Sequence, residues 1–380
     1  MNKILAMPAV FILLSCSHGN KPDIKKTIHK STLKEVSVAD TIEKPMIQYT
    51  DRQLESFLDS VGHLSVHPLL DKVAFGVDSV FRNQLQMDTT LSLDDFNKLK
   101  HAARKGVIAV NLARRIFGNN KIDSACNEKS VLSTYKPGLI PVVYYPFNKN
   151  KKAFDEFALC IGDPAHCQNA CLYFLRGQKV IARHNGYDRN GLDMGHHVDI
   201  DGKTVINYKV EVDRGSGIWW YQFFFYKYDG NKLIPVLSVP QNINLLQPSP
   251  WGVRELWFES FVQKTDPLVI KMVYHQQLPD TIKFDYFTTD PNLGPMIVND
   301  STYVRYSWNE QTKTLEGNFR QSKINQPQIL SYYLTDNELL FINAYYKDLK
   351  FFLLNKSKRK SILHYLNEIK NQSNRNNRGR

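Results

Sequence analysis

The sequence lacks the short motifs that most often bind nucleotides, phosphates or catalytic zinc. It contains no Walker loop, no glycine fingerprint for dinucleotides and no H-E-x-x-H pair. The stretch Arg214-Gly215-Ser216-Gly217 has glycines on both sides of a serine but not the spacing of a nucleophile elbow. It also lacks an apolar run of roughly 20 residues, the length that a membrane-spanning helix needs. These absences indicate no cofactor and favour binding over catalysis, although they do not decide whether the protein is an enzyme.

Acidic residues are scarce near the C-terminus, and this scarcity explains most of the net charge of +12. Residues 356–380 contain eight lysines and arginines but one glutamate, whereas residues 51–355 are nearly neutral. No groove-reading motif or basic-aromatic cluster accompanies the charge, so we expect no nucleic-acid partner. The basic segment 356–380 is typical of a solvated extension. The alternative is that its lysines and arginines contact anionic lipid head groups.

The beginning of the chain combines a positive charge, a short apolar run and a cysteine. Lys3 supplies the charge, residues 4–14 form the run, and Leu13-Leu14-Ser15-Cys16 closes it. This order resembles the lipobox signal of bacterial lipoprotein precursors. The resemblance implies that residues 1–15 are removed and that Cys16 becomes a lipidated N-terminus. An ordinary cleaved signal peptide is the alternative.

The same resemblance implies a location. Ser17, rather than an aspartate, follows Cys16, and no acidic cluster comes after it. In lipoproteins such a sequence favours sorting to the outer membrane, with the domain facing the periplasm. The membrane is therefore an expected partner, because two or more acyl chains give stable anchoring.

Cysteine is sparse in the remainder of the chain. Once Cys16 is set aside, four cysteines remain, in a compartment that oxidises thiols. Four cysteines allow three pairings, which sequence alone does not distinguish. We expect two disulfides, the first flanking a loop between two strands: Cys160 with Cys171, and Cys126 with Cys167. A zinc site that combines these cysteines with His166 or His184 is the alternative.

The hydrophobic pattern predicts an α+β fold with a helical N-terminal layer, a large antiparallel β-meander that is sandwich-like or strongly curved, and a C-terminal helix. Residues 93–117 carry an apolar stripe that predicts one helix, whereas Asp201-Gly202 and Asp229-Gly230 predict hairpin turns. The expected segments are a signal peptide (1–15), a lipidated cysteine with flexible linker (16–49), a helical segment (50–120), an antiparallel β-rich domain packed with it (121–334), C-terminal helices (335–370) and a basic disordered tail (371–380).

The strand predicted over residues 218–228 is aromatic on both faces. Such a strand should be covered on both sides, by a second sheet or by the 93–117 helix. Core packing is the simplest interpretation of its side chains. The alternative is a platform for stacking on sugar rings or a peptide, formed by Trp219, Trp220 and Tyr221.

Residues 188–201 hold the densest group of ionisable side chains. Alternate positions of a strand share a face, so pairs such as Asp199 and Asp201 could share a cation. The candidate metal ligands are Asp188, Asp193, His196, His197, Asp199 and Asp201. The calcium-loop pattern fails, and Asp-Gly and Asp-x-Asn-Gly are also ordinary turn sequences. Turn residues, a metal site and a catalytic His-Asp pair all remain open at this point.

Taken together, these features predict a lipid-anchored module for binding or assembly at the cell envelope, with a protein or glycan partner. A meander offers exposed edges and aromatic faces, and a tether raises the local concentration at the membrane. One alternative is a metal-dependent envelope hydrolase that uses the 188–201 group. Another is a neutralising partner of a toxin delivered to the periplasm.

Overall fold

The computed structural model describes most of the chain that follows the predicted linker. The described residues are 46–66, 84–118, 138–148, 150, 152–215, 218–245, 254–279, 293–332 and 337–378. They belong to one compact unit that begins at Met46. This part of the chain has helices near both of its ends and two antiparallel sheets, which confirms the predicted α+β class.

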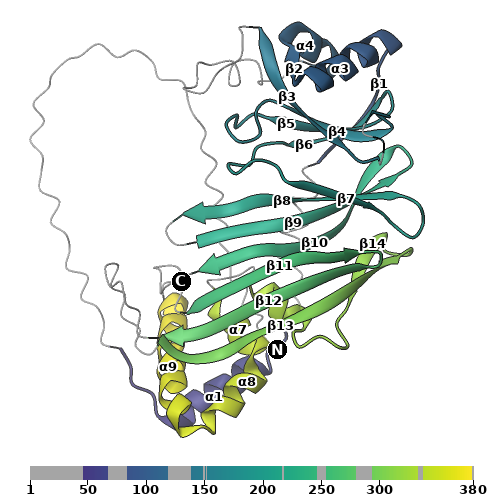
Figure 1. Ribbon diagram of the computed structural model, residues 1–380. Coiled ribbons are helices and arrows are strands. Elements are labelled where there is room, and N and C mark those ends of the chain that lie inside the picture. Colours follow the sequence, from purple (N-terminus) through teal and green to yellow (C-terminus); the bar gives the residue numbers. More distant parts are fainter. Residues whose placement is uncertain are drawn as a thin grey trace, which may run out of the picture. The chain divides into compact units, whose positions relative to one another are not determined.

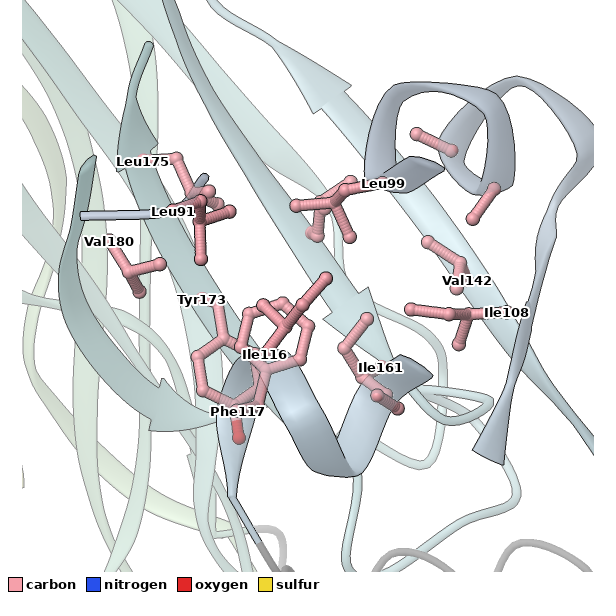
Figure 2. Packing of buried hydrophobic residues seen from close by; sticks show 14 of the residues in the cluster. Leu91, Leu99, Ile108, Ile116, Phe117, Val142, Ile161, Tyr173, Leu175 and Val180 are labelled. Carbon is pink, nitrogen blue, oxygen red and sulfur yellow. The ribbon is translucent and has the colours of Figure 1, made fainter. Parts of the chain in front are cut away.

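The smaller sheet has six strands in the spatial order β1-β6-β5-β4-β3-β2 (Figure 1). Its strands are β1 (Leu85–Thr90), β2 (Val107–Ala109), β3 (Leu139–Pro146), β4 (Glu156–Ile161), β5 (Cys171–Arg176) and β6 (Lys179–Asn185). Helices α3 (Leu93–Lys105) and α4 (Val110–Phe117) pack on one face of it. Figure 2 shows Phe117 against Tyr173 of β5, and their ring centroids are 4.0 Å apart.

The predicted single helix over residues 93–117 is wrong, because Gly106 ends α3. Gly106 has a φ of 73°, in the left-handed region that favours glycine at the end of a helix. Val107–Ala109 then pair with β3, and α4 begins after this short strand. The predicted start is confirmed, since the Ser92 side chain accepts a hydrogen bond from the backbone N–H of Asp95.

The larger sheet has eight strands, each paired with its neighbours in sequence. They are β7 (Met194–Val198), β8 (Thr204–Gly215), β9 (Ile218–Asp229), β10 (Lys232–Leu245), β11 (Glu255–Thr265), β12 (Leu268–Pro279), β13 (Leu293–Asn309) and β14 (Thr314–Asn318). This order confirms the predicted meander. The predicted turn glycines Gly202 and Gly230 have positive φ angles of 78° and 59°, as tight hairpin turns require.

Strand β9 is covered on both faces, as its sequence predicts. Phe224 and Tyr226 pack against the six-stranded sheet, and the hydroxyl of Tyr228 donates to the carbonyl of Phe157 at 3.2 Å. On the other face, Phe225 joins a core that includes side chains of β11 to β14. The cover is therefore a second sheet and the far strands of the same sheet. Helices α3 and α4 belong instead to a separate core on the six-stranded sheet.

Strand β10 explains how one sheet can cover itself. Its pairing with β9 shifts register between Pro235 and Leu237 and again between Pro240 and Asn242. Such bulges bend a strand and increase its twist. Strand β10 pairs with β11 only over residues 242–245, while its earlier part approaches β14. The sheet is therefore strongly curved.

The terminal helices form a further core against the eight-stranded sheet. They are α1 (Asp51–Gly62), α6 (Gln326–Ser331), α7 (Glu338–Ala344), α8 (Tyr346–Leu353) and α9 (Lys356–Arg378). All but α6 surround Leu278 and Ile297 of the sheet. Arg254, which is fully buried, donates through Nε to Glu338 at 2.9 Å and so ties α7 to the sheet.

Helix α9 extends further than the sequence predicts. A disordered tail was expected from residue 371, but the helix continues to Arg378. Asn371 is buried and its side chain accepts a hydrogen bond from the backbone N–H of Ile47 at 3.0 Å. The prediction of disorder is therefore wrong for residues 371–378, which continue the helix. The side chains of Asn371 and Asn374 hydrogen-bond to Ile47 and Tyr49 of the incoming N-terminal segment.

Candidate functional site

One face of strands β10 to β13, extended by the first residues of β9, carries aromatic and polar side chains, whereas most residues on the reverse of these strands are apolar. In β11, Phe258 is buried on the reverse face, while Trp257 and Glu259 point the other way. Residues paired directly across neighbouring strands share a face, so the register extends this surface over five strands. We name it the aromatic face, and it comprises Trp219, Asn242, Asn244, Trp257, Glu259, Phe261, Lys271, His275 and Tyr303.

A continuous row of four residues crosses this face from β9 to β12. Asn244 pairs with Trp219 on one side and with Trp257 on the other. Trp257 in turn pairs with His275, and the centroids of their rings are 5.7 Å apart. The row therefore places an amide between two indoles and an imidazole beside them. Indoles provide apolar stacking surface, and the amide and imidazole provide directional hydrogen bonds.

Large apolar groups on the aromatic face are accessible to solvent. Trp219 is 48% exposed, Phe261 39% and Tyr303 58%. Phe261 and Tyr303 lie on either side of Lys271 in the central strand β12. Trp257 and Phe261 are four residues apart in β11, which corresponds to about 13 Å along a strand. The aromatic groups are thus spread over an area suited to an extended ligand.

Two buried amide oxygens of the aromatic face have no hydrogen-bond partner within the described part of the chain. They are Oδ1 of Asn242 and Oδ1 of Asn244. Buried polar atoms are normally paired, since an unpaired one costs about 1–3 kcal/mol. Such atoms beside the exposed indole of Trp219 and the partly buried indole of Trp257 are the pattern expected where a ligand completes the hydrogen bonds.

Carboxylates adjoin the row. Burial raises the pKa of the Glu259 carboxyl above its ordinary value. Oε1 of Glu255 lies 3.3 Å from Nε2 of His275, within the range of an ion pair if the imidazole is protonated. The aromatic face therefore presents hydrogen-bond acceptors of both the amide and the carboxyl type.

The predicted platform of Trp219, Trp220 and Tyr221 is not formed as a unit, because successive residues of a strand point to opposite faces. Trp219 belongs to the aromatic face, whereas Trp220 points to the reverse. Tyr221 is only 7% exposed, and its hydroxyl donates to Glu211 at 2.8 Å. The second indole of the face is Trp257, whose position near Trp219 could not be predicted from the sequence because it belongs to a different strand.

The predicted metal site is not formed either. Within the described chain, no three His, Cys, Asp or Glu side chains are placed to hold a metal ion. Asp199 and Asp201 do share a cation, but it is the ammonium of Lys227, at 2.6 Å and 2.9 Å. Lys227 is fully buried and lies 3.9 Å from the centroid of the Trp308 ring. The charge that a metal would neutralise is therefore neutralised by the protein itself.

The remaining candidate ligands are dispersed. His196 pairs with Ile206 and His197 with Val205, so the two imidazoles lie on opposite faces of β7. Burial lowers the pKa of both imidazoles. Oδ1 of Asp188 accepts the backbone N–H of Asn190 at 2.9 Å, which is the turn role that the sequence also allowed. Asp193 is exposed.

The predicted disulfide between Cys160 and Cys171 is not formed, and both residues are free thiols. Cys160 pairs with Leu172 and Cys171 with Ile161, so the two side chains point to opposite faces of the sheet. Cys167 is disulfide-bonded. Cys126 lies outside the described residues, so its pairing with Cys167 stays a prediction. The zinc alternative with His166 or His184 finds no ligand group among the described residues.

No protein-family model and no curated protein matches this sequence. In the described ranges, no helix is both long and apolar enough to span a membrane. Cys16 lies outside those ranges, and its lipidation stays a prediction. The aromatic face is thus the surface on which the described chain best supports a function.

Proposed function

We propose that the protein is a lipid-anchored, periplasm-facing module of the outer membrane that binds an envelope partner on its aromatic face. The row from Trp219 to His275 is the observation on which this proposal depends. It combines exposed indole surface with buried acceptors that have no hydrogen-bond partner among the described residues. The lipobox-like sequence at Cys16 supplies the anchor, which would keep the face near its partner.

The composition of the row favours a glycan over a protein. Sugar rings stack their apolar faces on indoles, and their hydroxyl groups donate to amide and carboxyl oxygens. The unpaired Oδ1 atoms of Asn242 and Asn244 are acceptors of this kind. A protein partner would be expected to cover Phe261 and Tyr303 as well, at the other end of the face.

The binding proposal is tested with Trp219→Ala, because this indole is half-exposed and its loss should leave the fold intact. Ile200→Ala is the matched control, since Ile200 is 88% exposed in the turn between β7 and β8. The tagged proteins are purified from their own envelope and the bound glycans and proteins identified. Purified envelope glycans are then titrated against each protein by tryptophan fluorescence.

Trp219→Ala should weaken binding about tenfold, the effect of removing one stacked aromatic group. Ile200→Ala should bind like the wild type. Equal capture by the wild type and Trp219→Ala would show that the aromatic face is not the binding surface. A protein that binds through Tyr303, with no glycan bound, would replace the glycan by a protein as the partner.

The anchor is tested separately. Cells that express the protein are supplied with a labelled fatty acid, and the purified chain should incorporate the label. Cys16→Ser should abolish incorporation, whereas Cys126→Ser should retain it, because only the first cysteine follows the lipobox-like sequence. Label that persists in Cys16→Ser would refute the predicted attachment site.

The alternatives gain less support from the geometry. The hydrolase would need Asp199 and Asp201 as metal ligands, but both carboxylates contact Lys227. Neutralisation of a delivered toxin stays a prediction, and no described contact favours it over glycan binding.

A further inference from the structure

Helices α8 and α9 meet at a corner (Figure 1). Two large apolar side chains of this corner are exposed. Phe351 is 67% exposed and Leu354 is 83% exposed. The backbone N–H of Leu354 donates to the carbonyl of Phe351 at 3.2 Å, so the two residues lie on one turn. Their neighbour Leu353 is buried in the helical core. The corner therefore displays apolar surface that the described part of the chain leaves exposed.

Lysines surround this apolar tip. Lys347 precedes Phe351 by four residues, which places both on the same side of α8. Lys356 and Lys360 are likewise one turn apart at the start of α9. All three are exposed. We name these residues the helical corner: Lys347, Phe351, Leu354, Lys356 and Lys360.

The positive charge of the helical corner is not neutralised by nearby carboxylates. Residues 346–360 contain six lysines and arginines and one aspartate. Lys350 pairs with Asp59 at 2.7 Å, and Arg359 pairs with Glu55 at 2.6 Å. No described carboxylate is within ion-pair distance of the three lysines of the corner. Their charge is therefore available to an external anion.

The N-terminal segment runs along α9 before it reaches this corner. The backbone N–H of Ile47 donates to the side chain of Asn371 at 3.0 Å. Oδ2 of Asp51 then lies 3.0 Å from Nη2 of Arg359, in the first turn of α9. Twelve residues of a helix span about 18 Å, so the chain that leads back toward Cys16 leaves the folded unit about that far from the corner. The flexible linker that the sequence predicts, about thirty residues long, spans such a distance, and a lipid at Cys16 would keep the corner within reach of a bilayer.

We propose that the helical corner docks on the surface of an anionic bilayer. Phe351 and Leu354 enter the interface, while the three lysines contact the head groups. Apolar tips flanked by lysines bind such surfaces by combining burial with electrostatic attraction. This inference rests on the proposed function only in assuming that a lipid at Cys16 keeps the protein at a membrane. The helical corner would then make a second contact with that membrane, weaker than the lipid anchor, and this contact would orient the aromatic face relative to the bilayer.

The test uses the full chain with an environment-sensitive dye attached to Leu354→Cys, and the same dye on Ile200→Cys as the control. Dye-treated wild type corrects for the background labelling of the native cysteines. Vesicles of phosphatidylcholine alone, or with about one third phosphatidylglycerol, are added and the emission spectrum is measured. A dye at position 354 should shift to shorter wavelength with anionic vesicles, and a dye at position 200 should not.

Variants in the labelled background separate the two contributions. Phe351→Ser should weaken the vesicle-dependent shift about tenfold in lipid concentration. Lys356→Gln and Lys360→Gln should each weaken it about fivefold, because one lysine near an anionic surface contributes about that factor. Lys264→Gln, an exposed lysine at the end of β11, is the control and should leave the shift unchanged.

Two results would overturn the proposal. The first is a dye at position 354 that keeps its aqueous emission while the protein floats with the vesicles. The second is a shift of the same size at position 200, which would indicate general adsorption. Neither result bears on glycan binding, because Trp219→Ala is assayed without vesicles. Loss of glycan binding with an intact shift at position 354 would refute the proposed function alone.

Discussion

Both ends of strand β9 adjoin polar side chains, but only at one end are all of these side chains paired within the described part of the protein. Near its last residue, Lys227 contacts two aspartates and the ring of Trp308. Near its first residue, Trp219 adjoins Asn244, whose Oδ1 has no described partner. Completed networks stabilise a fold, whereas accessible incomplete ones mark places where another molecule can supply the missing contacts.

The comparison also separates two kinds of ionisable cluster that look alike in a sequence. We name Lys203, Lys227, Asp199, Asp201 and Asp229 the charged cluster. Burial raises the pKa of Asp201 and is the largest single influence, but the hydrogen bonds from Lys227 and Lys203 and the charges of these two lysines together outweigh it, so the pKa is lowered. Lys203 bridges Asp229 at 2.6 Å. This cluster is a structural clamp between the turn after β7 and the end of β9.

The largest expected effect follows from opening this clamp. Lys227→Met keeps the length of the side chain but leaves Asp199 and Asp201 without their counter-ion. Breaking one side of a buried ion pair typically costs about 3–5 kcal/mol, and we expect about 3 kcal/mol because the carboxylates are partly solvated. Urea unfolding at neutral pH measures the change in the free energy of unfolding.

The control for this prediction is Lys203→Met, which removes a solvent-accessible lysine of the same cluster. Its effect should be much smaller. Adding Asp199→Asn to Lys227→Met should restore part of the lost stability, because one uncompensated charge is removed. Equal effects of the two lysine variants would contradict a clamp centred on Lys227.

A second completed network joins the two sheets and predicts a dependence on pH. His184 of β6 is buried, with Nδ1 2.5 Å from the hydroxyl of Tyr208 and Nε2 2.6 Å from Oε1 of Gln84. Because the Gln84 oxygen can only accept, Nε2 holds the proton and Nδ1 accepts the Tyr208 hydroxyl. Burial lowers the pKa of His184 from 6.5 to about 3.

At pH values between about 3 and 6.5, the His184 side chain is therefore protonated in the unfolded chain and neutral in the folded chain. Since the folded pKa of this base is depressed, stability is fully present above about pH 6.5 and is lost as the pH falls toward 3. The expected loss between pH 7 and pH 5 is about 2 kcal/mol. Urea unfolding over this range should show that His184→Gln flattens the slope, whereas His101→Gln at an exposed position of α3 does not.

The sequence predicts the strands and turns of the large sheet better than it predicts how the strands pair with one another. The hairpin turns at Gly202 and Gly230 were predictable because their chemistry is local. The aromatic face was not, because it depends on the register between β10 and β11, two strands joined by a long connection. Asn244 and Trp257 meet only through that register. A bulge in β10 shifts its pairing with β9 by one residue, and no local sequence pattern predicts this bulge.

The dependence on contacts between distant strands also explains why the metal site predicted for residues 188–201 is not formed. Its spacing correctly brought Asp199 and Asp201 together around a cation. The identity of that cation could not be predicted, because Lys227 lies in the next-but-one strand and looks like an ordinary polar interruption of an aromatic run. The single helix predicted for 93–117 failed at Gly106, which a continuous apolar stripe concealed.

The smallest expected change in stability comes from a substitution at Asn244, and it most directly tests the contrast between the two ends of β9. Asn244→Leu replaces an amide whose buried Oδ1 is unpaired with an apolar side chain of similar size. If the amide oxygen accepts a hydrogen bond only from a bound ligand, the substitution should raise the free energy of unfolding of the ligand-free protein by about 1 kcal/mol, because an unsatisfied buried acceptor is removed. It should also weaken partner binding about tenfold.

Opposite signs for stability and binding distinguish a ligand-binding residue from a structural one. Asn309→Leu is the matched control, since the Asn309 side chain donates to Glu316 at 2.7 Å and accepts the backbone N–H of Gln311 at 2.8 Å. It should lose stability and keep binding unchanged, because its hydrogen bonds are internal. A destabilised Asn244→Leu that still binds its partner would mean that this amide is satisfied within the protein, and the contrast between the two ends of β9 would no longer indicate a binding surface.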